Sequence, residues 1–430
     1  YKICSSGEKM IKKILREEYS LSDRVIDLDN KVFDKIQGPL KKIEETYRYN
    51  QLKVLSAFRD CRIREPHFAA TTGYGYDDMG REAIDELYAN VFSCEDALVR
   101  HSIVSGTHAL TLCLFGVLRP GDRLVSVTGN PYDTLKGVIS AKNKGSLADF
   151  GVSYSQIELK DNLPDLEGIK ALPSDTKAVL IQRSKGYDWR NTLSVSQIGE
   201  IISAVKSINP EIVCIVDNCY GEFTETLEPT QVGADLMAGS LIKNPGGGIA
   251  RCGAYIAGKS KYVELAAYKL NCVGQGKDVG PSLGFNREIL QGFFMAPHTT
   301  AQAVKTALFC SGLFSELGFE VCPLPEDDRG DIIQAIKFGN PDLLIAFCQG
   351  IQKGAPIDSF ATPMPWEMPG YDCEVIMAAG AFTQGATTEL SADAPLREPY
   401  VAYMQGSLDF ECGRIGVLVA LQNMIDSGLI

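Results

Sequence analysis

Two residues with chemically useful side chains stand in the middle of the 430-residue chain. Asp217 ends the strand-like run EIVCIVD, and Lys243 lies in the small, glycine-rich segment GSLIKNPGGG. An apolar run that ends in Asp is typical of a parallel strand that delivers a carboxylate to the carboxyl edge of a sheet. A lysine among small apolar residues is partly desolvated, which lowers its pKa and favours the neutral, nucleophilic amine.

Together these two side chains match the chemical requirements of pyridoxal phosphate. This cofactor needs a lysine that binds its aldehyde as a Schiff base, and a carboxylate that keeps its ring nitrogen protonated. Either residue alone has an ordinary explanation, because aspartates often end strands and lysines often occupy loops. The pair, in this order and with these flanking residues, is the more specific signal.

A phosphate-binding element is expected upstream of the aspartate, where the segment SGTHALTLCLFGVL begins. Ser105, Gly106 and Thr107 stand at the predicted start of a helix. Small residues there let backbone N–H groups approach an anion, and the helix dipole stabilises its charge. By itself the segment also fits a simple helix N-cap, and the Asp–Lys pair favours the phosphate site. Ser240, just before Lys243, would add a hydroxyl to the same phosphate.

Two loops carry further aromatic candidates. Tyr132 follows the predicted strand in RLVSVTGNPYDT, where its ring can stack on a flat cofactor and its hydroxyl can transfer a proton. A simple turn tyrosine after proline is the alternative. The segment TTGYGYDDMGR places Tyr74 and Tyr76 among glycines, with Arg81 at the start of a helix. Its glycine spacing does not match the dinucleotide fingerprint GxGxxG, and the chain contains no Walker motif.

The composition favours a cytoplasmic enzyme and counts against several other classes of protein. The 42 basic and 54 acidic residues give a formal net charge of −12, unlike the basic surface of a nucleic-acid-binding protein. No stretch approaches the roughly 18 apolar residues of a membrane span, and the first residues lack the core of a signal peptide. The 13 cysteines are scattered and only 4 histidines occur, so we expect reduced thiols and no metal site.

The order of strand-like and helix-like segments predicts an α/β fold in three parts. Residues 1–62 are expected to form a helical arm, residues 63–290 a large α/β domain, and residues 291–430 a smaller α+β domain that starts with a long helix. In the large domain, alternating strands and amphipathic helices predict a mostly parallel, doubly wound sheet. The strand candidates there are residues 123–128, 152–159, 177–182 and 211–217, with a helix over residues 195–208.

In their order along the chain, SGTHAL, GNPYDT, VDNCYGEF and GSLIKNPGGGIARCGAYIAGK resemble the fold-type I pyridoxal-phosphate enzymes of the cystathionine/methionine lyase group. The resemblance is closest to the aluminium-resistance, or methionine γ-lyase-like, branch, and it covers nearly the whole chain. It includes GQGKDVGPSLGFNREILQGFFMAPHTTAQAV after the lysine and YVAYMQGSLDFECGRIGVLVAL near the end. The resemblance implies a homotetramer built from dimers, in which two subunits share each active site.

The resemblance also implies roles for individual residues. Lys243 would form the internal aldimine and remove the substrate α-proton, and Asp217 would pair with the ring nitrogen. Tyr132 would stack on the ring and share proton transfer with Lys243. The expected cofactor-binding residues are Ser105, Gly106, Thr107, Tyr132, Asp217, Tyr220, Ser240, Lys243 and Tyr76.

One departure from the family lies in the loop that contacts the phosphate of the neighbouring subunit. The better-known lyases carry a Tyr-x-Arg motif there, whereas this chain reads GYGYDDMGR. Tyr74, Tyr76 and Arg81 are alternatives for that contact. The substrate carboxylate is expected to meet an arginine, for which the candidates are Arg397, which leads into a predicted strand, Arg414, and Arg183 at the carboxyl edge of the sheet.

These residues predict a pyridoxal-phosphate-dependent carbon–sulfur lyase that acts on a sulfur-containing amino acid. Elimination at Cβ or Cγ would release a thiol, ammonia and a keto acid, and the sequence does not distinguish the two reactions. An aminotransferase or aldolase on the same scaffold would use the same Asp and Lys. A third alternative is a catalytically silent protein that keeps the fold for regulation. The presence of Asp217, Lys243 and the SGT segment together argues against it.

Overall fold

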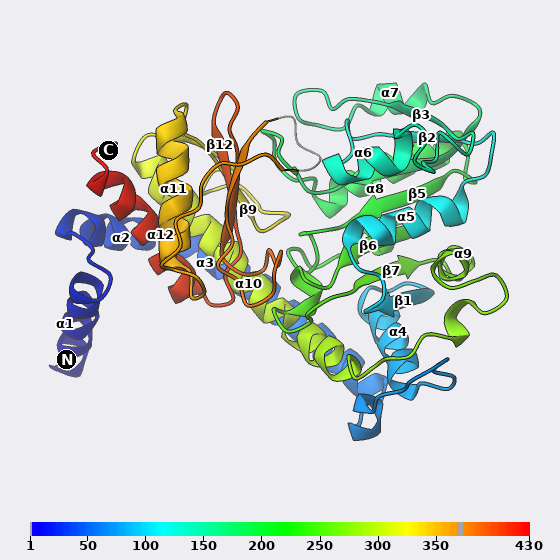
Figure 1. Cartoon of the computed structure of the whole chain (residues 1–430), viewed down its shortest axis with the longest axis horizontal. Coiled ribbons are helices and arrows are strands. Elements are labelled where there is room, and N and C mark those ends of the chain that lie inside the picture. The colour runs from blue at the N-terminus through cyan, green and yellow to red at the C-terminus, as the bar shows by residue number, and fades with distance from the viewer. Residues whose placement is uncertain (1, 369–372) are drawn as a thin grey trace. The chain divides into compact units, whose positions relative to one another are not determined.

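The computed structural model describes residues 2–368 and 373–430, which divide into two compact units (Figure 1). Unit 1 contains Tyr1–Glu45, Ala301–Asp328 and Ile332–Ile430, and unit 2 contains Thr46–Thr300 and Arg329–Asp331. These limits differ from the predicted ones at residues 62 and 290. The physical reason is that two long helices, α3 (Gln37–Asp60) and α10 (Asn286–Glu316), each contribute residues to both units.

Unit 2 is built around a seven-stranded sheet with the strand order β1-β7-β6-β5-β4-β2-β3. Strand β7 runs antiparallel to β1 and β6, whereas the pairs from β6 to β3 are parallel. The predicted mostly parallel sheet is therefore confirmed, and the four predicted strands correspond to β2–β5. The strands are β1 (Asp96–Arg100), β2 (Arg123–Ser126), β3 (Ser153–Gln156), β4 (Thr176–Gln182), β5 (Val213–Asp217), β6 (Leu236–Ser240) and β7 (Ala254–Gly258).

The central strands read as continuous apolar runs because both faces of the sheet are covered. Val213 and Ile215 of β5 join an apolar core that includes residues of α5 and α9. Cys214 and Val216, which alternate with them, join a second core that includes residues of α4 and α8. Successive side chains of a strand point to opposite faces, so a strand between two helical layers needs apolar residues at every position.

Four of the helices of unit 2 each connect two successive strands. Helix α8 spans the predicted residues 195–208 and begins with a capping box, in which the side chains and backbone N–H groups of Ser194 and Gln197 bond reciprocally. The helices are α4 (Met79–Val91), α5 (Gly106–Val117), α6 (Asp133–Ser140), α7 (Leu166–Lys170), α8 (Val195–Ile208) and α9 (Ser260–Leu270), with short 3₁₀ segments η1 (Glu65–Phe68), η2 (Pro229–Val232), η3 (Asn244–Gly246) and η4 (Gly276–Asp278).

Unit 1 contains a five-stranded antiparallel sheet with the order β10-β11-β12-β9-β8. Helix α11 packs on this sheet and α12 packs on α11, which agrees with the expected α+β character. Helix α10 begins earlier than predicted and contains Pro297 in its interior. The remaining elements are β8 (Glu320–Cys322), β9 (Ile333–Lys337), β10 (Val375–Ala378), β11 (Ser391–Pro395), β12 (Val401–Gln405), α1 (Lys2–Glu17), α2 (Asp23–Lys35), α11 (Pro341–Gly354) and α12 (Phe410–Asp426).

No helix within the described parts of the chain combines the length and the apolar character that crossing a membrane requires.

Candidate active site

A cavity of about 170 Å³ in unit 2 lies at the carboxyl ends of β4, β5 and β6. Parallel α/β sheets place their binding sites at this edge, because loops and helix N-termini converge there. The structure brings together most of the predicted cofactor-binding residues around this cavity. Its lining includes Ser105, Gly106, Thr107, Tyr132, Asp217, Tyr220, Ser240 and Lys243.

Asp217 is the last residue of β5, and it is held between the neighbouring strands. It is in register with Gln182 of β4 and Ala238 of β6. Its Oδ1 accepts a hydrogen bond from the backbone N–H of Cys219 at 3.1 Å. Burial raises the pKa of Asp217, while the charge of Lys243 and the Cys219 N–H act in the opposite direction. The carboxylate is thus a buried charge that a nearby cation would stabilise.

Lys243 follows β6 and immediately precedes the 3₁₀ segment η3. Its Nζ lies 3.8 Å from the centroid of the Tyr220 ring. Burial lowers the pKa of Lys243, but Tyr220, Cys219 and Asp217, which can each carry negative charge, raise it above its ordinary value overall. The predicted effect of desolvation is therefore present, but the predicted overall lowering of this pKa is not found, because the electrostatic neighbours outweigh the burial.

The start of helix α5 confirms the N-cap interpretation of the SGT segment, while phosphate binding there stays a prediction. Ser105 is the N-cap, and its Oγ accepts a hydrogen bond from the N–H of His108 at 3.1 Å. The same residue lines the cavity with Gly106 and Thr107. A Cβ atom at Gly106 would lie 2.8 Å from the Cys219 Sγ, so only glycine lets the helix approach the end of β5 this closely. The cavity therefore faces the positive end of a helix.

Tyr132 lies at the N-cap position of α6 and lines the cavity. Its ring centroid is 6.1 Å from that of Tyr187, and its Cδ2 would lie 3.5 Å from a Cβ atom at Gly186. The ring is therefore positioned at the wall of the cavity. Its stacking on a cofactor stays a prediction.

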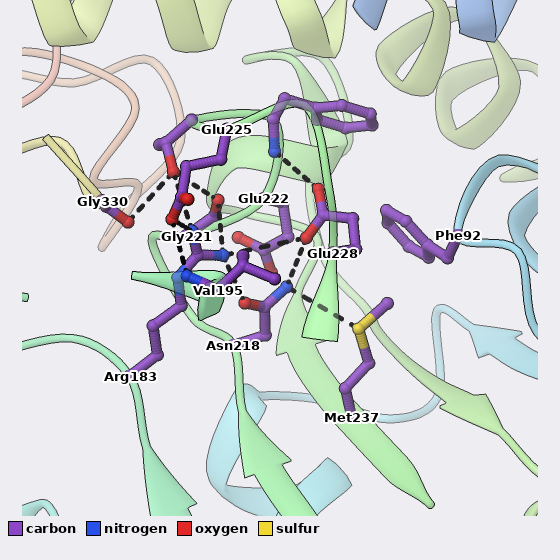
Figure 2. Close-up of polar contacts among 12 residues, drawn as sticks. Phe92, Arg183, Val195, Asn218, Gly221, Glu222, Glu225, Glu228, Met237 and Gly330 are labelled. Atoms are coloured by element: carbon purple, nitrogen blue, oxygen red, sulfur yellow. Dashed lines mark hydrogen bonds and ion pairs between the residues drawn. The ribbon is translucent and has the colours of Figure 1, made fainter. Parts of the chain in front are cut away.

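Arg183 does not point into the cavity, although it directly follows β4. Its side chain is fully buried, and its N–H groups donate to protein acceptors (Figure 2). These acceptors are Asn218 Oδ1, the Gly221 carbonyl oxygen, Thr224 Oγ1, Glu225 Oε1 and, at 3.4 Å, the Leu193 carbonyl oxygen. The prediction that Arg183 binds the substrate carboxylate is therefore corrected, because its hydrogen-bonding capacity is already used.

The two other candidate arginines lie in unit 1. Arg414, on α12, donates from Nε and Nη2 to the two carboxylate oxygens of Asp29 at 2.6 and 2.9 Å, and its guanidinium lies over the Phe33 ring. A bidentate pair of this kind occupies the guanidinium, which counts against a role for Arg414 in substrate binding. Arg397 is exposed in the connection between β11 and β12.

The GYGYDDMGR segment separates into two exposed tyrosines and a buried arginine. Tyr74 and Tyr76 are 66% and 58% exposed, and their rings stack at a centroid distance of 5.5 Å. Arg81 is buried and donates to the carbonyl oxygens of Gly75 and Gly280 at 2.6 and 2.9 Å. Of the three alternatives for an intersubunit contact, Arg81 is therefore engaged within its own chain, while both tyrosines face outward.

A family model described as methionine gamma-lyase matches residues 25–425. The chain belongs to the methionine γ-lyase family. Among its relatives, the uncharacterized protein YnbB of Bacillus subtilis (strain 168) is 48% identical over 400 residues, which cover 92% of this chain and 95% of YnbB.

Solved structures agree with this membership of the methionine γ-lyase family. A carbon–sulfur lyase involved in aluminium resistance from Clostridium novyi NT has a TM-score of 0.92 and 48% identity, covering 96% of this chain and 98% of that one. The pyridoxal-5'-phosphate-dependent protein YhfS from Escherichia coli has a TM-score of 0.58 at 14% identity, covering 90% and 97%. The second likeness concerns the fold alone, and the predicted fold type I is confirmed.

Sequence reasoning missed several residues that line the cavity of this methionine γ-lyase family member. Gln182 ends β4 and donates from Nε2 to the Ser184 carbonyl oxygen, and the Thr134 hydroxyl lies 2.7 Å from that of Thr107. Cys219 and Ser184 also belong to the lining. The signal for Gln182 was present, because it ends a predicted strand in the same way as Asp217. Thr134 and Cys219 carried no comparable pattern.

Proposed function

We propose that the chain is a pyridoxal-phosphate-dependent carbon–sulfur lyase that acts on a sulfur-containing amino acid. The observation that carries this proposal is the meeting of Asp217, Lys243 and the N-terminus of α5 at one cavity. Membership of the methionine γ-lyase family and the likeness to the Clostridium novyi lyase support it.

The cavity residues fit the three chemically distinct parts of pyridoxal phosphate. Lys243 can bind the aldehyde, and Asp217 can pair with a protonated ring nitrogen. The phosphate fits the N-terminus of α5, where Ser105, Gly106 and Thr107 supply N–H and hydroxyl groups, with Ser240 beside them. When bound, the cofactor supplies an electron sink for the carbanion that α-proton removal leaves on an amino acid.

The protein's own residues then divide the remaining tasks. Lys243 Nζ accepts the α-proton of the substrate, and it needs to lose a proton first because its neighbours raise its pKa. The buried Asp217 carboxylate holds positive charge on the ring side of the site. Tyr132 lines the cavity, and its hydroxyl would protonate the departing sulfur.

The proposal also covers how the substrate is bound and how the subunits assemble. Both β- and γ-elimination would release a thiol, ammonia and a keto acid, and Arg397 remains the candidate for the substrate carboxylate. We propose a homotetramer of two dimers, in which Tyr76 or Tyr74 contacts the phosphate of the neighbouring subunit. The exposure of both rings supports an intermolecular role for them.

The first experiment tests the cofactor. Protein purified with pyridoxal phosphate is expected to absorb in the visible range and to be labelled covalently after borohydride reduction. Lys243→Ala is expected to fold and to lose the label, whereas Lys261→Ala, which removes an exposed lysine of α9, keeps it. A label that persists in Lys243→Ala would contradict the assignment.

The second experiment tests the reaction. The protein is mixed with L-cystathionine, L-methionine or L-cysteine, and the keto acid, ammonia and thiol are measured separately. A lyase forms all three without a second substrate. Turnover that depends on an added keto acid would indicate an aminotransferase, and the absence of any amino-acid-dependent spectral change would indicate a silent protein.

A further inference from the structure

The turn that follows β5 carries unusual backbone strain. In residues 217–223, Tyr220 has φ +73° and Phe223 has φ +63°, which is the left-handed region. Residues other than glycine pay a conformational cost there and keep such angles only where surrounding contacts hold them. Asp217 begins this turn. Tyr220, which belongs to the turn, has its ring against Lys243 Nζ. The contacts that hold the turn therefore also hold the candidate site.

The buried side chains of Arg183 and Glu228 form hydrogen bonds with residues of the turn (Figure 2). Arg183 Nη1 donates to Asn218 Oδ1 at 2.8 Å and to the Gly221 carbonyl oxygen at 2.9 Å. Glu228 accepts from the Phe223 N–H at 2.9 Å and from Asn218 Nδ2 at 3.1 Å. Each of these bonds fixes one backbone or side-chain group of the turn, and together they enclose Glu222.

Glu222 stands at the centre of this cluster and is fully buried. Its Oε1 accepts a hydrogen bond from the Tyr255 hydroxyl at 2.8 Å. A Cβ atom at Gly239 would lie 2.2 Å from the same oxygen, so the carboxyl group occupies the space that this glycine leaves open beside Ser240. Within the described residues, Glu222 Oε2 has no hydrogen-bond partner.

The backbone of Glu222 connects the turn to the lysine loop. Asn244, which follows Lys243, is fully buried and donates from Nδ2 to the carbonyl oxygens of Tyr220 and Glu222 at 2.9 and 3.0 Å. A displacement of Glu222 would therefore reach Lys243 through one residue and Asp217 through the turn.

The charge of Arg183 acts on Glu222, but Arg183 forms its ion pairs with other carboxylates. Arg183 pairs with Glu225 at 2.7 Å and lies 3.8 Å from Glu228, and Lys53 acts on Glu228. No ion pair to Glu222 is found in the part of the chain that the structure describes. Burial raises the pKa of Glu222 from 4.5 to about 8. The titratable and charged groups that face it are Arg183, Glu228 and Tyr255, with Tyr88, Cys219 and, beyond Glu228, Lys53.

We propose that Glu222 is a positioning residue whose uncharged carboxyl group holds the turn 217–223, and with it Asp217 and Tyr220, in place. Its importance for catalysis rests on the function proposed above, because Asp217 and Lys243 are the groups that it positions. Ionisation places a negative charge in the cluster that Arg183 and the Tyr255 hydroxyl offset only in part, and opening of the turn to water relieves that charge.

The pH dependence of this opening has a definite sign. The carboxyl group has a higher pKa in the closed turn than in an opened, hydrated one. Its contribution to closure is therefore complete below the ordinary pKa and is lost as the pH rises toward the closed-state value. Between these limits the opening equilibrium grows by up to about tenfold per pH unit.

Hydrogen exchange of the backbone amides of residues 217–223 measures this opening on the full chain, both as purified and saturated with pyridoxal phosphate. After correction for the intrinsic exchange rate, wild-type protection is expected to fall between pH 5.5 and pH 8, by about tenfold per unit at most. Glu222→Gln keeps an uncharged group of the same shape, so its protection is expected to stay level. Glu264→Gln is the matched control, because the exposed Glu264 also accepts a tyrosine hydroxyl, that of Tyr268 at 2.7 Å.

Two further variants are expected to change the protection in specific ways, and a merely structural role of Glu222 does not predict these changes. Tyr255→Phe removes a hydrogen bond that stabilises the ionised carboxylate, so the pH at which protection stops falling is expected to move upward. Glu222→Leu is expected to lower protection at every pH, and Glu222→Gln and Tyr255→Phe decide the matter if this variant does not fold.

Equal pH slopes in wild type and Glu222→Gln would overturn the inference, as would an unchanged levelling pH in Tyr255→Phe. Absorbance of bound pyridoxal phosphate, recorded on the same samples, keeps the two proposals apart. A wild-type protein that binds no cofactor rejects the proposed function, while the exchange slopes still decide the role of Glu222.

Discussion

Asp217 occupies a position where a negative charge is costly by itself. Burial raises its pKa, and the Cys219 N–H and the charge of Lys243 offset only part of that cost. A cationic ring nitrogen in the cavity would supply the missing charge, because opposite charges in a poorly solvated site favour each other's ionised form. The residue is therefore poorly placed for a structural role and well placed for a cofactor.

Replacing Asp217 tests this electrostatic role. Asp217→Ala is expected to lower kcat by about 10²–10³-fold, as for loss of one preorganised charge contact in a dry site, with a smaller effect on KM. Asp217→Asn keeps a hydrogen-bonding group without the charge, and its kcat is expected to lie between those of the wild type and Asp217→Ala. Steady-state kinetics with the best substrate of the panel measure the effect, and near-normal kcat in both variants would rule out the role.

Arg183 gives the opposite case, a charged residue at the sheet edge whose task is structural. Arg183→Met removes the cation from a buried cluster and leaves Glu228 without its main partner, so we expect a loss of about 3–5 kcal/mol of unfolding free energy. Urea denaturation measures it, with Arg123→Met as the control, because Arg123 pairs with Asp175 nearer the surface. A raised KM with unchanged stability would instead support a substrate-binding role.

At the scale of secondary structure, Ser105 at the start of α5 combines helix capping with a place in the cavity wall. Ser105 caps the helix through its hydroxyl and also lines the cavity. The uncapped N–H groups of the first helical turn carry the positive end of the helix dipole toward the cavity. Capping and phosphate binding are therefore compatible at this position, and only variants that separate them reveal both.

Two substitutions at Ser105 separate these tasks. Ser105→Ala is expected to cost about 1 kcal/mol of stability in the protein without cofactor, because it removes the cap. Ser105→Asp keeps a capping oxygen and stability, but its negative charge would repel a phosphate, so pyridoxal phosphate affinity should fall more than in Ser105→Ala. Thermal unfolding and absorbance titration give the two readouts. Equal cofactor affinities in the two variants would place the phosphate elsewhere.

At the scale of the whole molecule, the exposed pair Tyr74 and Tyr76 supports the proposal that two subunits share each active site. Their segment is fixed, because Arg81 ties the Gly75 carbonyl oxygen to that of Gly280, and Thr71 bonds to Asp78 and Ser282. Two aromatic rings on a fixed and exposed loop favour recognition of another surface.

Complementation between two inactive variants tests whether subunits share their sites. Lys243→Ala and Tyr76→Ala are each expected to be nearly inactive as pure proteins. After dissociation, mixing and reassociation, some mixed dimers would contain one intact site, and activity is expected to return. Light scattering and native mass spectrometry verify that mixed dimers form. If they form and stay inactive, Tyr76 serves the site of its own subunit or no site at all.

The sequence by itself determined the parts of this protein that depend on local pattern. Continuous apolar runs predicted the central strands β4 and β5, because strands covered on both faces need apolar residues throughout. The position of Asp217 at a strand end and of the SGT segment at a helix start placed both at the same sheet edge, where the cavity lies. These features follow from residue type and order, which a single chain displays.

Only the tertiary structure decided where long side chains point and which charges meet. Arg183 follows β4 at the expected edge, yet its guanidinium turns into a buried cluster because Asn218, Gly221 and Glu225 supply acceptors there. Burial alone suggested a lowered pKa for Lys243, whereas its neighbours reverse the direction. Hydrogen bonds and electrostatic interactions join residues far apart in the chain, so their balance appears only when the fold brings those residues together.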